Sequence, residues 1–299
     1  MVDNIIDNLS NLNLNDSNKL KSDDTVDKIL NDLTNLNIND VKDNKTKIIE
    51  TFNNNVKNKQ IDISSSNKKH DGAEGHWLEK QMGLKPNGKN QPDIYGYEMK
   101  KENTKITFGD YAASEYIFSA KRPIINERNK WTNDKVKMTT NEFIKTFGTL
   151  KESKNRYSWS GSCVPTYDTW NDCGQKLVIS ENNDICIYYS YSKDKRELKN
   201  NFPEYLKQDD LLIVIWLKDK LSKNINDKFN KNGFFICKKT NNCFNQICFG
   251  PPLSYELFID NIKKKNIIFD SGMVTGNSRK YSHFRGTGKF WNTLITDTY

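Results

Sequence analysis

A change in composition near Gly72 most constrains what this chain of 299 residues can fold into. Before that point the chain is rich in Asn, Asp, Lys and Ser, has no proline or glycine, and has one aromatic residue, Phe52. Such a segment has few side chains that can build a hydrophobic core. We therefore expect residues 1–70 to form a low-complexity, largely disordered tail and residues 71–299 to form the folded domain.

A duplicated segment lies within the predicted tail. The stretch "DNIIDNLSNLNLND", residues 3–16, recurs as "DKILNDLTNLNIND", residues 27–40. Apolar residues in each copy recur at helical spacing, so the alternative to disorder is a pair of short amphipathic helices that dock a partner. Two copies are fewer than the three or more repeats that a solenoid needs to build its own core.

The rest of the chain mixes strand and helix patterns. Runs of β-branched and aromatic residues between Asn, Asp and Gly predict strands at "KLVIS", "DICIYYSYS", "DLLIVIWLK", "GFFICKK" and "NQICFG". Helical periodicity predicts helices at "AEGHWLEKQMG", which Gly83 would end, at "TTNEFIKTFG", which Gly148 would end, and at "LSYELFIDNIKKK". This order of elements predicts an α/β or α+β fold.

Export signals and metal-binding cysteine motifs are not evident. The N-terminus lacks the basic start and apolar stretch of a signal peptide, and no run of about 18 apolar residues occurs, so we expect a cytoplasmic protein. The six cysteines are therefore expected to be reduced and buried as small apolar side chains. A zinc cluster is the alternative, but the spacings lack the paired C-x2-C of common zinc sites.

Basic residues gather in the later part of the chain. The formal net charge is +8, acidic residues crowd the first third, and lysine and arginine outnumber acids after Lys100. The clusters "SAKRP", "NIKKKN" and "GNSRKYSHFRGTGK" suit a polyanion such as nucleic acid. Solvated surface lysines are the alternative explanation, and charge alone does not decide between the two.

The stretch "QPDIYGYEMKK" carries the strongest chemical signal. On a strand, Glu98 and Lys100 point to one face, while Tyr97 and Met99 point to the other. Counting by twos puts Asp93 on the face opposite Glu98, but a turn or bulge at Gly96 would bring it round.

Two converging carboxylates with a lysine predict a divalent metal site. Asp93 and Glu98 would bind Mg²⁺, which prefers oxygen ligands, and Lys100 would orient or deprotonate an attacking water or stabilise charge on a phosphate. Glu79, on the helix before this strand, would hold a metal-bound water or Lys100 in place. Phosphodiester hydrolysis fits these groups, although a lone D-x4-E-x-K also occurs at solvent-exposed strand edges.

These residues carry a resemblance to a known family. The stretch "GAEGHWLEKQMGLKPNGKNQPDIYGYEMKK" resembles the catalytic core of PD-(D/E)XK nucleases, in the branch shared by MutH and the MvaI/BcnI-like type II restriction endonucleases. Similar patches follow at "KITFGDYAASEYIFSAKRP", "NEFIKTFG" and "DSGMVTGNSRKYSHFRGTGKFW". The resemblance runs from about Gly72 to Trp291, and the middle from Ser160 to Cys186 is unmatched.

The resemblance implies a fold and an activity. It implies a mixed sheet between helices, two lobes that clasp double-stranded DNA, and Mg²⁺-dependent hydrolysis that leaves 5′-phosphates. By position, Asp93 and Glu98 are metal ligands, Lys100 is the catalytic lysine and Glu79 is the supporting acid. A monomer is implied, and a cognate DNA methyltransferase is the expected functional partner of a restriction enzyme.

A glycine-rich basic segment near the C-terminus is the predicted DNA-binding region. Its glycines allow a close backbone approach, and its basic side chains offer donors to guanine edges or phosphates. The predicted DNA-binding residues are His283, Arg285, Arg279 and Lys280, together with Lys121 and Arg122 near the scissile phosphate. A flexible surface loop is the alternative for the segment, and simple exposure is the alternative for Lys121 and Arg122.

Three functions agree with these observations. A sequence-specific DNA endonuclease of restriction type is favoured because Asp93, Glu98 and Lys100 are intact. A MutH-like nicking enzyme of DNA repair is the second, and a catalytically silent DNA-binding protein with the same fold is the third.

Overall fold

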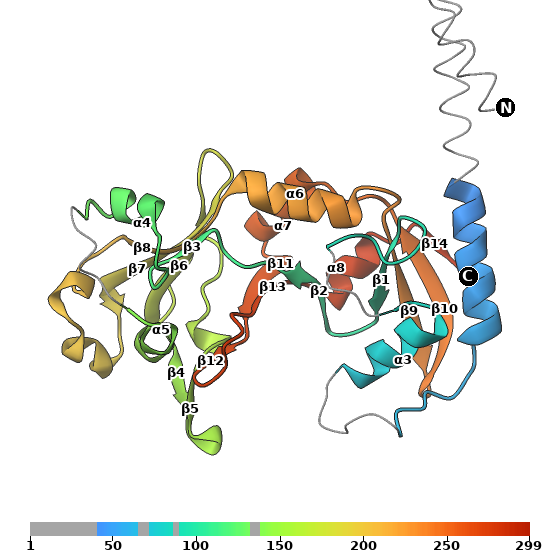
Figure 1. Ribbon diagram of the computed structural model, residues 1–299, viewed down its shortest axis with the longest axis horizontal. Coiled ribbons are helices and arrows are strands. Elements are labelled where there is room, and N and C mark those ends of the chain that lie inside the picture. Colours follow the sequence, from blue (N-terminus) through green and yellow to red (C-terminus); the bar gives the residue numbers. More distant parts are fainter. Residues whose placement is uncertain (1–40, 65–71, 86–89, 132–137) are drawn as a thin grey trace, which may run out of the picture.

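The computed structural model describes residues 41–64, 72–85, 90–131 and 138–299. The chain forms two lobes joined by a central sheet, and one helix, α6 (Lys218–Phe229), runs across above that sheet in Figure 1. Among the described residues, no helix is both long and apolar enough to span a membrane. The mixture of sheets and helices confirms the predicted α+β class.

The first lobe, which we call the β1 lobe, is built on a four-stranded sheet of order β1-β9-β10-β14. β1 runs parallel to β9, while β10 pairs antiparallel with both β9 and β14. The elements of this lobe are α3 (Ala73–Gln81), β1 (Glu98–Lys101), β9 (Phe234–Thr240), β10 (Cys243–Gly250), α8 (Gly288–Thr293) and β14 (Asp297–Thr298). The predicted helix that ends at Gly83 and the last two predicted strands are thereby confirmed.

A helix over residues 41–55, blue in Figure 1, packs on this sheet. Its side chains Ile48 and Phe52, and Val56 just after it, are fully buried. They belong to one apolar cluster with Tyr97, which precedes β1, and Met99, which lies on it. The helix therefore supports the strand that carries the predicted catalytic residues.

The expected boundary at residue 70 is wrong for residues 41–64, which belong to the folded lobe. The apolar residues of this segment are few, but they recur every four positions on one helix face. A composition averaged over 70 residues hides that face. The duplicated segments, residues 3–16 and 27–40, lie outside the described residues.

A central three-stranded sheet of order β11-β13-β2 lies between the lobes (Figure 1). The elements in and over this region are β2 (Lys105–Asp110), α6 (Lys218–Phe229), α7 (Tyr255–Lys263), β11 (Ile267–Ser271) and β13 (Ser282–Thr287). Phe108 of β2 contacts Phe229 of α6 and Trp291 of α8, with ring centroids 5.4 and 4.6 Å away. This buried aromatic group fixes the end of α6 against both the sheet and the β1 lobe.

The second lobe, which we call the β7 lobe, contains two sheets of order β3-β8-β7-β6 and β12-β5-β4. Its strands are β3 (Glu115–Tyr116), β4 (Thr149–Lys151), β5 (Arg156–Trp159), β6 (Cys173–Ile179), β7 (Ile185–Asp194), β8 (Leu211–Trp216) and β12 (Met273–Val274). Its helices are α4 (Pro123–Arg128) and α5 (Thr140–Phe147), and four 3-10 turns span Glu152–Lys154, Gly161–Cys163, Glu197–Asn201 and Glu204–Leu206.

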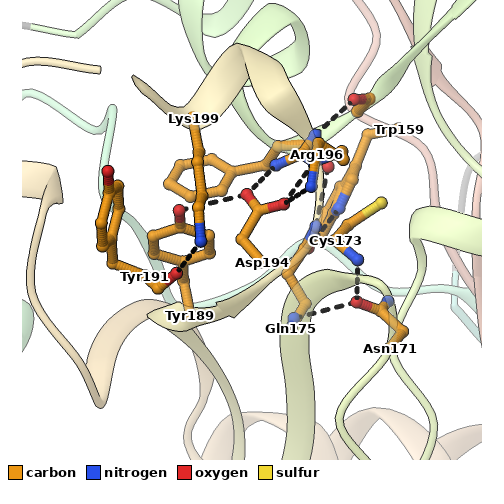
Figure 2. Close-up of polar contacts among 11 residues, drawn as sticks. Trp159, Asn171, Cys173, Gln175, Tyr189, Tyr191, Asp194, Arg196 and Lys199 are labelled. Atoms are coloured by element: carbon orange, nitrogen blue, oxygen red, sulfur yellow. Dashed lines mark hydrogen bonds and ion pairs between the residues drawn. The ribbon is translucent and has the colours of Figure 1, made fainter. Parts of the chain in front are cut away.

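Buried hydrogen bonds join the two sheets of the β7 lobe. Gln175 on β6 accepts a hydrogen bond from the indole of Trp159 on β5 at 2.8 Å and donates one to the carbonyl of Phe147 at 2.7 Å (Figure 2). Thr139 and Glu142 form a capping box at the start of α5, and Gly148 ends it as predicted. The unmatched middle of the sequence, Ser160 to Cys186, is therefore part of this lobe.

Candidate active site

Strand β1 places Glu98 and Lys100 on one face, as its period of two predicts. Tyr97 and Met99 point into the cluster shared with the helix over residues 41–55, whereas Lys100 Nζ lies 2.6 Å from Glu98 Oε1. The parallel pairing with β9 fixes this register, because Glu98 lies opposite Phe234 and its N–H donates to the carbonyl of Gly233 at 3.0 Å. The predicted convergence of these two side chains is confirmed.

A tight turn brings Asp93 to the same place. Ile94 and Tyr97 exchange backbone hydrogen bonds, and the two residues between them, Tyr95 and Gly96, have φ of 48° and 82°. Two positive φ values in a two-residue loop define a type I′ turn. Across this turn, the carboxylate of Asp93 accepts a hydrogen bond from the N–H of Met99 at 2.9 Å. The turn expected at Gly96 is thereby confirmed.

A glycine is required at this turn for a second reason. A Cβ atom built on Gly96 would lie 2.7 Å from the side-chain nitrogen of Asn232. Asn232 in turn donates to the carbonyls of Tyr95 and Gly96. The loop after α6 therefore clamps the turn that positions Asp93.

The carboxylate of Glu98 is the centre of the site. Glu98 is 2% exposed. Its Oε1 contacts Lys100 Nζ at 2.6 Å and also Lys228 Nζ, from the last turn of α6, at 3.0 Å. Its Oε2 is buried and has no hydrogen-bond partner among the described residues. An unpaired buried carboxylate oxygen carries a large desolvation cost, which a bound cation would remove.

Sequence reasoning missed Lys228 because it missed α6. The signal was present, since Leu221, Ile225 and Phe229 recur every four residues and are all buried on one face of the helix. Even with that helix predicted, its contact with Glu98 depends on how α6 crosses the central sheet.

The surroundings of the site shift the pKa values of Asp93 and Lys100. Asp93 keeps contact with solvent, but the protein packed around its carboxyl group raises its pKa to about 6, and the negative charge of Glu98 adds to this rise. Burial lowers the pKa of Lys100, against the opposing attraction of Glu98. A lysine with a lowered pKa gives up its proton more easily and can then accept one from water.

The arrangement fits a divalent cation that needs few protein ligands. Asp93 and Glu98 supply two carboxylates, and Mg²⁺ typically completes its shell with water and substrate oxygens. In the described part of the chain, no three His, Cys, Asp or Glu side chains come together as a metal site. All six cysteines are unpaired thiols, and five of them are buried.

Glu79 lies on the wall of the same cleft as Lys100. The cleft, of about 840 Å³, is also lined by Glu74 of α3 and Arg285 of β13. Glu74 forms ion pairs with Lys101 at 2.6 Å and Lys239 at 2.7 Å. These two contacts tie α3 to β1 and β9, so Glu74 is an acid of α3 with a structural role that the sequence did not indicate.

Two predicted DNA-binding residues share one face of β13. His283 lies opposite Asp110 of β2 on one side and Asp270 of β11 on the other. Arg285, two residues on, places Nε 3.4 Å from Asp270 Oδ2. Burial lowers the pKa of His283, and the charge of Asp110 opposes this shift. The central sheet thus presents a polar face that begins at the cleft, where Arg285 is part of the lining.

The other predicted DNA-binding residues divide into exposed and buried ones. Arg279 is exposed, contacts Asp110 at 3.2 Å and lies over the ring of Tyr281. Lys280 is exposed beside it, with Nζ 4.8 Å from the ring centroid of Phe118.

Lys121 and Arg122 differ although they are neighbours. Lys121 is exposed, but Arg122 is only 6% exposed and donates to Ser119 O and Asn126 Oδ1. The expectation that Arg122 contacts a phosphate is therefore not supported, because its guanidinium is buried and donates hydrogen bonds to other groups of the β7 lobe.

Unsatisfied polar atoms point to the same residues. Within the described ranges, five buried side-chain polar atoms lack a hydrogen-bond partner, and three of them are Glu98 Oε2, His283 Nδ1 and Arg285 Nε. Folded proteins leave few such groups, and a ligand is one reason to keep them. The predicted site residues are thus over-represented among the groups that the fold alone does not satisfy.

The chain is similar in sequence to known restriction endonucleases. The sequence matches the LlaMI restriction endonuclease family over residues 56–299. It is 42% identical over 275 residues to the type II restriction enzyme ScrFI of Lactococcus lactis subsp. cremoris, a match that covers 86% of this chain and 98% of that protein.

The fold is similar to that of a solved nuclease. The restriction endonuclease MvaI, in a complex with its cognate DNA substrate, superposes with a TM-score of 0.51 at 13% sequence identity. The match covers 87% of this chain and 97% of that one. At this level of identity the similarity shows a shared fold, which is the PD-(D/E)XK architecture with two lobes.

Proposed function

The chain belongs to the LlaMI restriction endonuclease family and is a type II site-specific deoxyribonuclease, and we propose that Asp93, Glu98 and Lys100 form its Mg²⁺-dependent active site. Hydrolysis at this site breaks a phosphodiester bond of duplex DNA and leaves a 5′-phosphate. The family favours restriction over the repair and catalytically silent alternatives.

One observation carries the assignment of the site. Glu98 is a buried carboxylate with two lysines on one oxygen and no partner on the other. A structural ion pair would satisfy both oxygens, because leaving one unpaired costs stability. Asp93 and Glu98 would hold the cation, which supplies Lewis-acid activation of the phosphate and of a bound water.

Lys100 is suited to handle the proton of the attacking water. It is held beside Glu98, and its lowered pKa makes the neutral amine more accessible than in an exposed lysine. When protonated, the same ammonium group would stabilise negative charge on the phosphate. Glu79, on the cleft wall, would hold a water in position.

The polar face of β13 is the proposed DNA contact. His283 and Arg285 each carry a buried nitrogen that makes no hydrogen bond, and both groups can donate to base edges or phosphates. Arg279, Lys280 and Lys121 are exposed cations that suit phosphate contacts. The proposal includes cleavage by a monomer and a cognate methyltransferase that protects the same DNA site.

The test is a substitution that removes a ligand without changing shape. Glu98→Gln should abolish cleavage of a plasmid while the protein still binds its target duplex, because the basic surface does not depend on Glu98. Glu50 is an exposed glutamate on the helix over residues 41–55, so Glu50→Gln is the matched control and should cleave normally. Full activity of the Glu98 variant would refute the site, and mapping of the wild-type fragment ends would check the 5′-phosphate.

A further inference from the structure

Lys228 is a second cation at the active site that the catalytic motif does not include. Its Nζ lies 3.0 Å from Glu98 Oε1, the same oxygen that Lys100 contacts at 2.6 Å. Glu98 thus has two ammonium groups on one oxygen and none on the other. With Asp93 nearby, two carboxylates face two lysines, so the site without a metal can be electrically neutral.

The end of α6 is fixed by packing and hydrogen bonds, and this places Lys228 next to Glu98. Phe229, the next residue, is fully buried and packs on Phe108 and Trp291. Asn226, half a turn before, accepts the N–H of Tyr255 through its side chain at 3.2 Å. Lys228 also lies in the last helical turn, where the helix dipole favours a cation.

The two lysines differ in how freely they can leave Glu98. Lys100 is buried, with its side chain 9% exposed, and its Nζ lies 5.5 Å from the ring centroid of Phe229. The side chain of Lys228 is 19% exposed, and its long flexible stem can carry the ammonium group into solvent. Only Lys228 can therefore release its contact without leaving an ammonium group enclosed in protein.

We propose that Lys228 is a positioning residue that serves as the counter-charge of Glu98 before the metal binds and competes with the divalent cation for that carboxylate. A cation that binds the free oxygen, Glu98 Oε2, is repelled by the two ammonium groups on Oε1, and withdrawal of Lys228 into solvent would lower this repulsion. The inference rests on the metal site proposed above and adds a residue that sets the affinity of that site for metal.

The direct test is metal affinity in the DNA-free full-length protein. We would measure Mn²⁺ binding from the electron paramagnetic resonance signal of the free ion, with wild type and with Lys228→Met, Lys228→Arg and Lys223→Met. Lys223 is an exposed lysine on the same helix, so its variant controls for the loss of one positive charge. Lys228→Met should bind Mn²⁺ about threefold to tenfold more tightly, because it removes both a competitor and a nearby repulsive charge.

The controls separate positioning from a general effect. Lys228→Arg and Lys223→Met should bind Mn²⁺ like the wild type. The rise in Tm that saturating Ca²⁺ produces should be larger in Lys228→Met than in wild type, because the variant lacks the counter-charge until the metal binds.

Two outcomes would refute different parts of the argument. If Glu98→Gln binds Mn²⁺ as tightly as wild type, the proposed metal site is wrong. If Glu98→Gln loses binding but Lys228→Met binds no more tightly than wild type, the metal site stands and the role of Lys228 is wrong. A folding failure of Lys228→Met would appear as a lost cooperative melt, and Lys228→Ala, Lys228→Gln and Lys228→Arg would then be compared by the same titration.

Discussion

Two buried ion pairs in this protein have the same spacing but opposite character. In the β1 lobe, Glu98 and Lys100 are two residues apart on β1. In the β7 lobe, Asp194 and Arg196 are also two residues apart, at the end of β7. Each acid is almost fully buried, so burial and spacing do not distinguish them.

The pairs differ in how completely their atoms are bonded. Asp194 accepts Arg196 Nε at 2.9 Å, Arg196 Nη2 at 2.6 Å, the Arg196 N–H at 3.0 Å and the Tyr189 hydroxyl at 3.1 Å (Figure 2). Arg196 also donates to the carbonyl of Gly148 at 2.9 Å. Both carboxylate oxygens of Asp194 are thus satisfied, whereas Glu98 keeps one oxygen unpaired.

The pKa shifts of the basic partners follow this difference. Burial opposes the charge on Arg196, but its hydrogen bonds and attraction to Asp194 outweigh burial and raise its pKa. Burial lowers the pKa of Lys100, and the attraction of Glu98 does not compensate. We call the Asp194–Arg196 pair saturated, because both carboxylate oxygens are bonded, and the Glu98–Lys100 pair unsaturated, because one oxygen is not. A saturated pair holds its charges fixed and stabilises the fold, while an unsaturated pair keeps an open position and a proton that can move.

The largest effect should come from breaking the saturated pair. Arg196→Met leaves the carboxylate of Asp194 buried without its guanidinium, which should destabilise the protein by about 3–5 kcal/mol. Urea denaturation would measure this, with the exposed Arg156→Met as a control expected within about 0.5 kcal/mol of wild type. A loss under about 1 kcal/mol would show that the pair is not structural.

Breaking the unsaturated pair should affect catalysis instead of folding. Lys100→Met should slow cleavage by about 10²- to 10³-fold. The change in unfolding free energy should be smaller than that of Arg196→Met, because Lys228 still neutralises Glu98 and no buried charge is left without a counter-charge. Single-turnover cleavage and urea denaturation of the same preparation would measure both. A stability loss as large as that of Arg196→Met would remove the distinction between the two pairs.

Arg285 is an intermediate case, with one contact to Asp270 and a buried Nε that lacks a hydrogen bond. If it reads bases, Arg285→Ala should cost about 1–3 kcal/mol of discrimination between cognate and scrambled duplexes. Lys121→Ala should weaken both duplexes alike and reduce the salt slope of affinity by about one unit. Affinities measured in Ca²⁺ across a salt series would test this, and an equal loss for both duplexes with Arg285→Ala would make it a backbone contact.

The smallest effect concerns the pH dependence of His283. Burial lowers its pKa in the folded state, although Asp110 and Asp270 oppose this and Arg285 and Arg279 add to it. The unfolded state therefore binds a proton below about pH 6.5 that the folded state does not, so stability is full above that pH and falls as the pH drops toward the folded pKa. His283→Gln should lose less stability than wild type over that window, and urea denaturation at several pH values would detect the difference. Parallel curves for the two proteins would contradict the lowered pKa.

The sequence determined the features that depend on local periodicity. The period of two placed Glu98 and Lys100 on one face of β1, and the five predicted strands and three predicted helices formed because their apolar residues recur at the spacing of one element. Gly83 and Gly148 mark the helix ends as expected. These features are encoded within about ten neighbouring residues, so one sequence suffices to find them.

The tertiary structure decided which distant side chains meet. The convergence of Asp93 with Glu98 needed a type I′ turn that Asn232 clamps, and the contact of Lys228 needed the crossing of α6 over the central sheet. The burial of Arg122 and the packing of the helix over residues 41–55 likewise depend on surfaces from elsewhere in the chain. A residue's local pattern shows which way its side chain points, but its partners and its pKa depend on what the fold brings to that side.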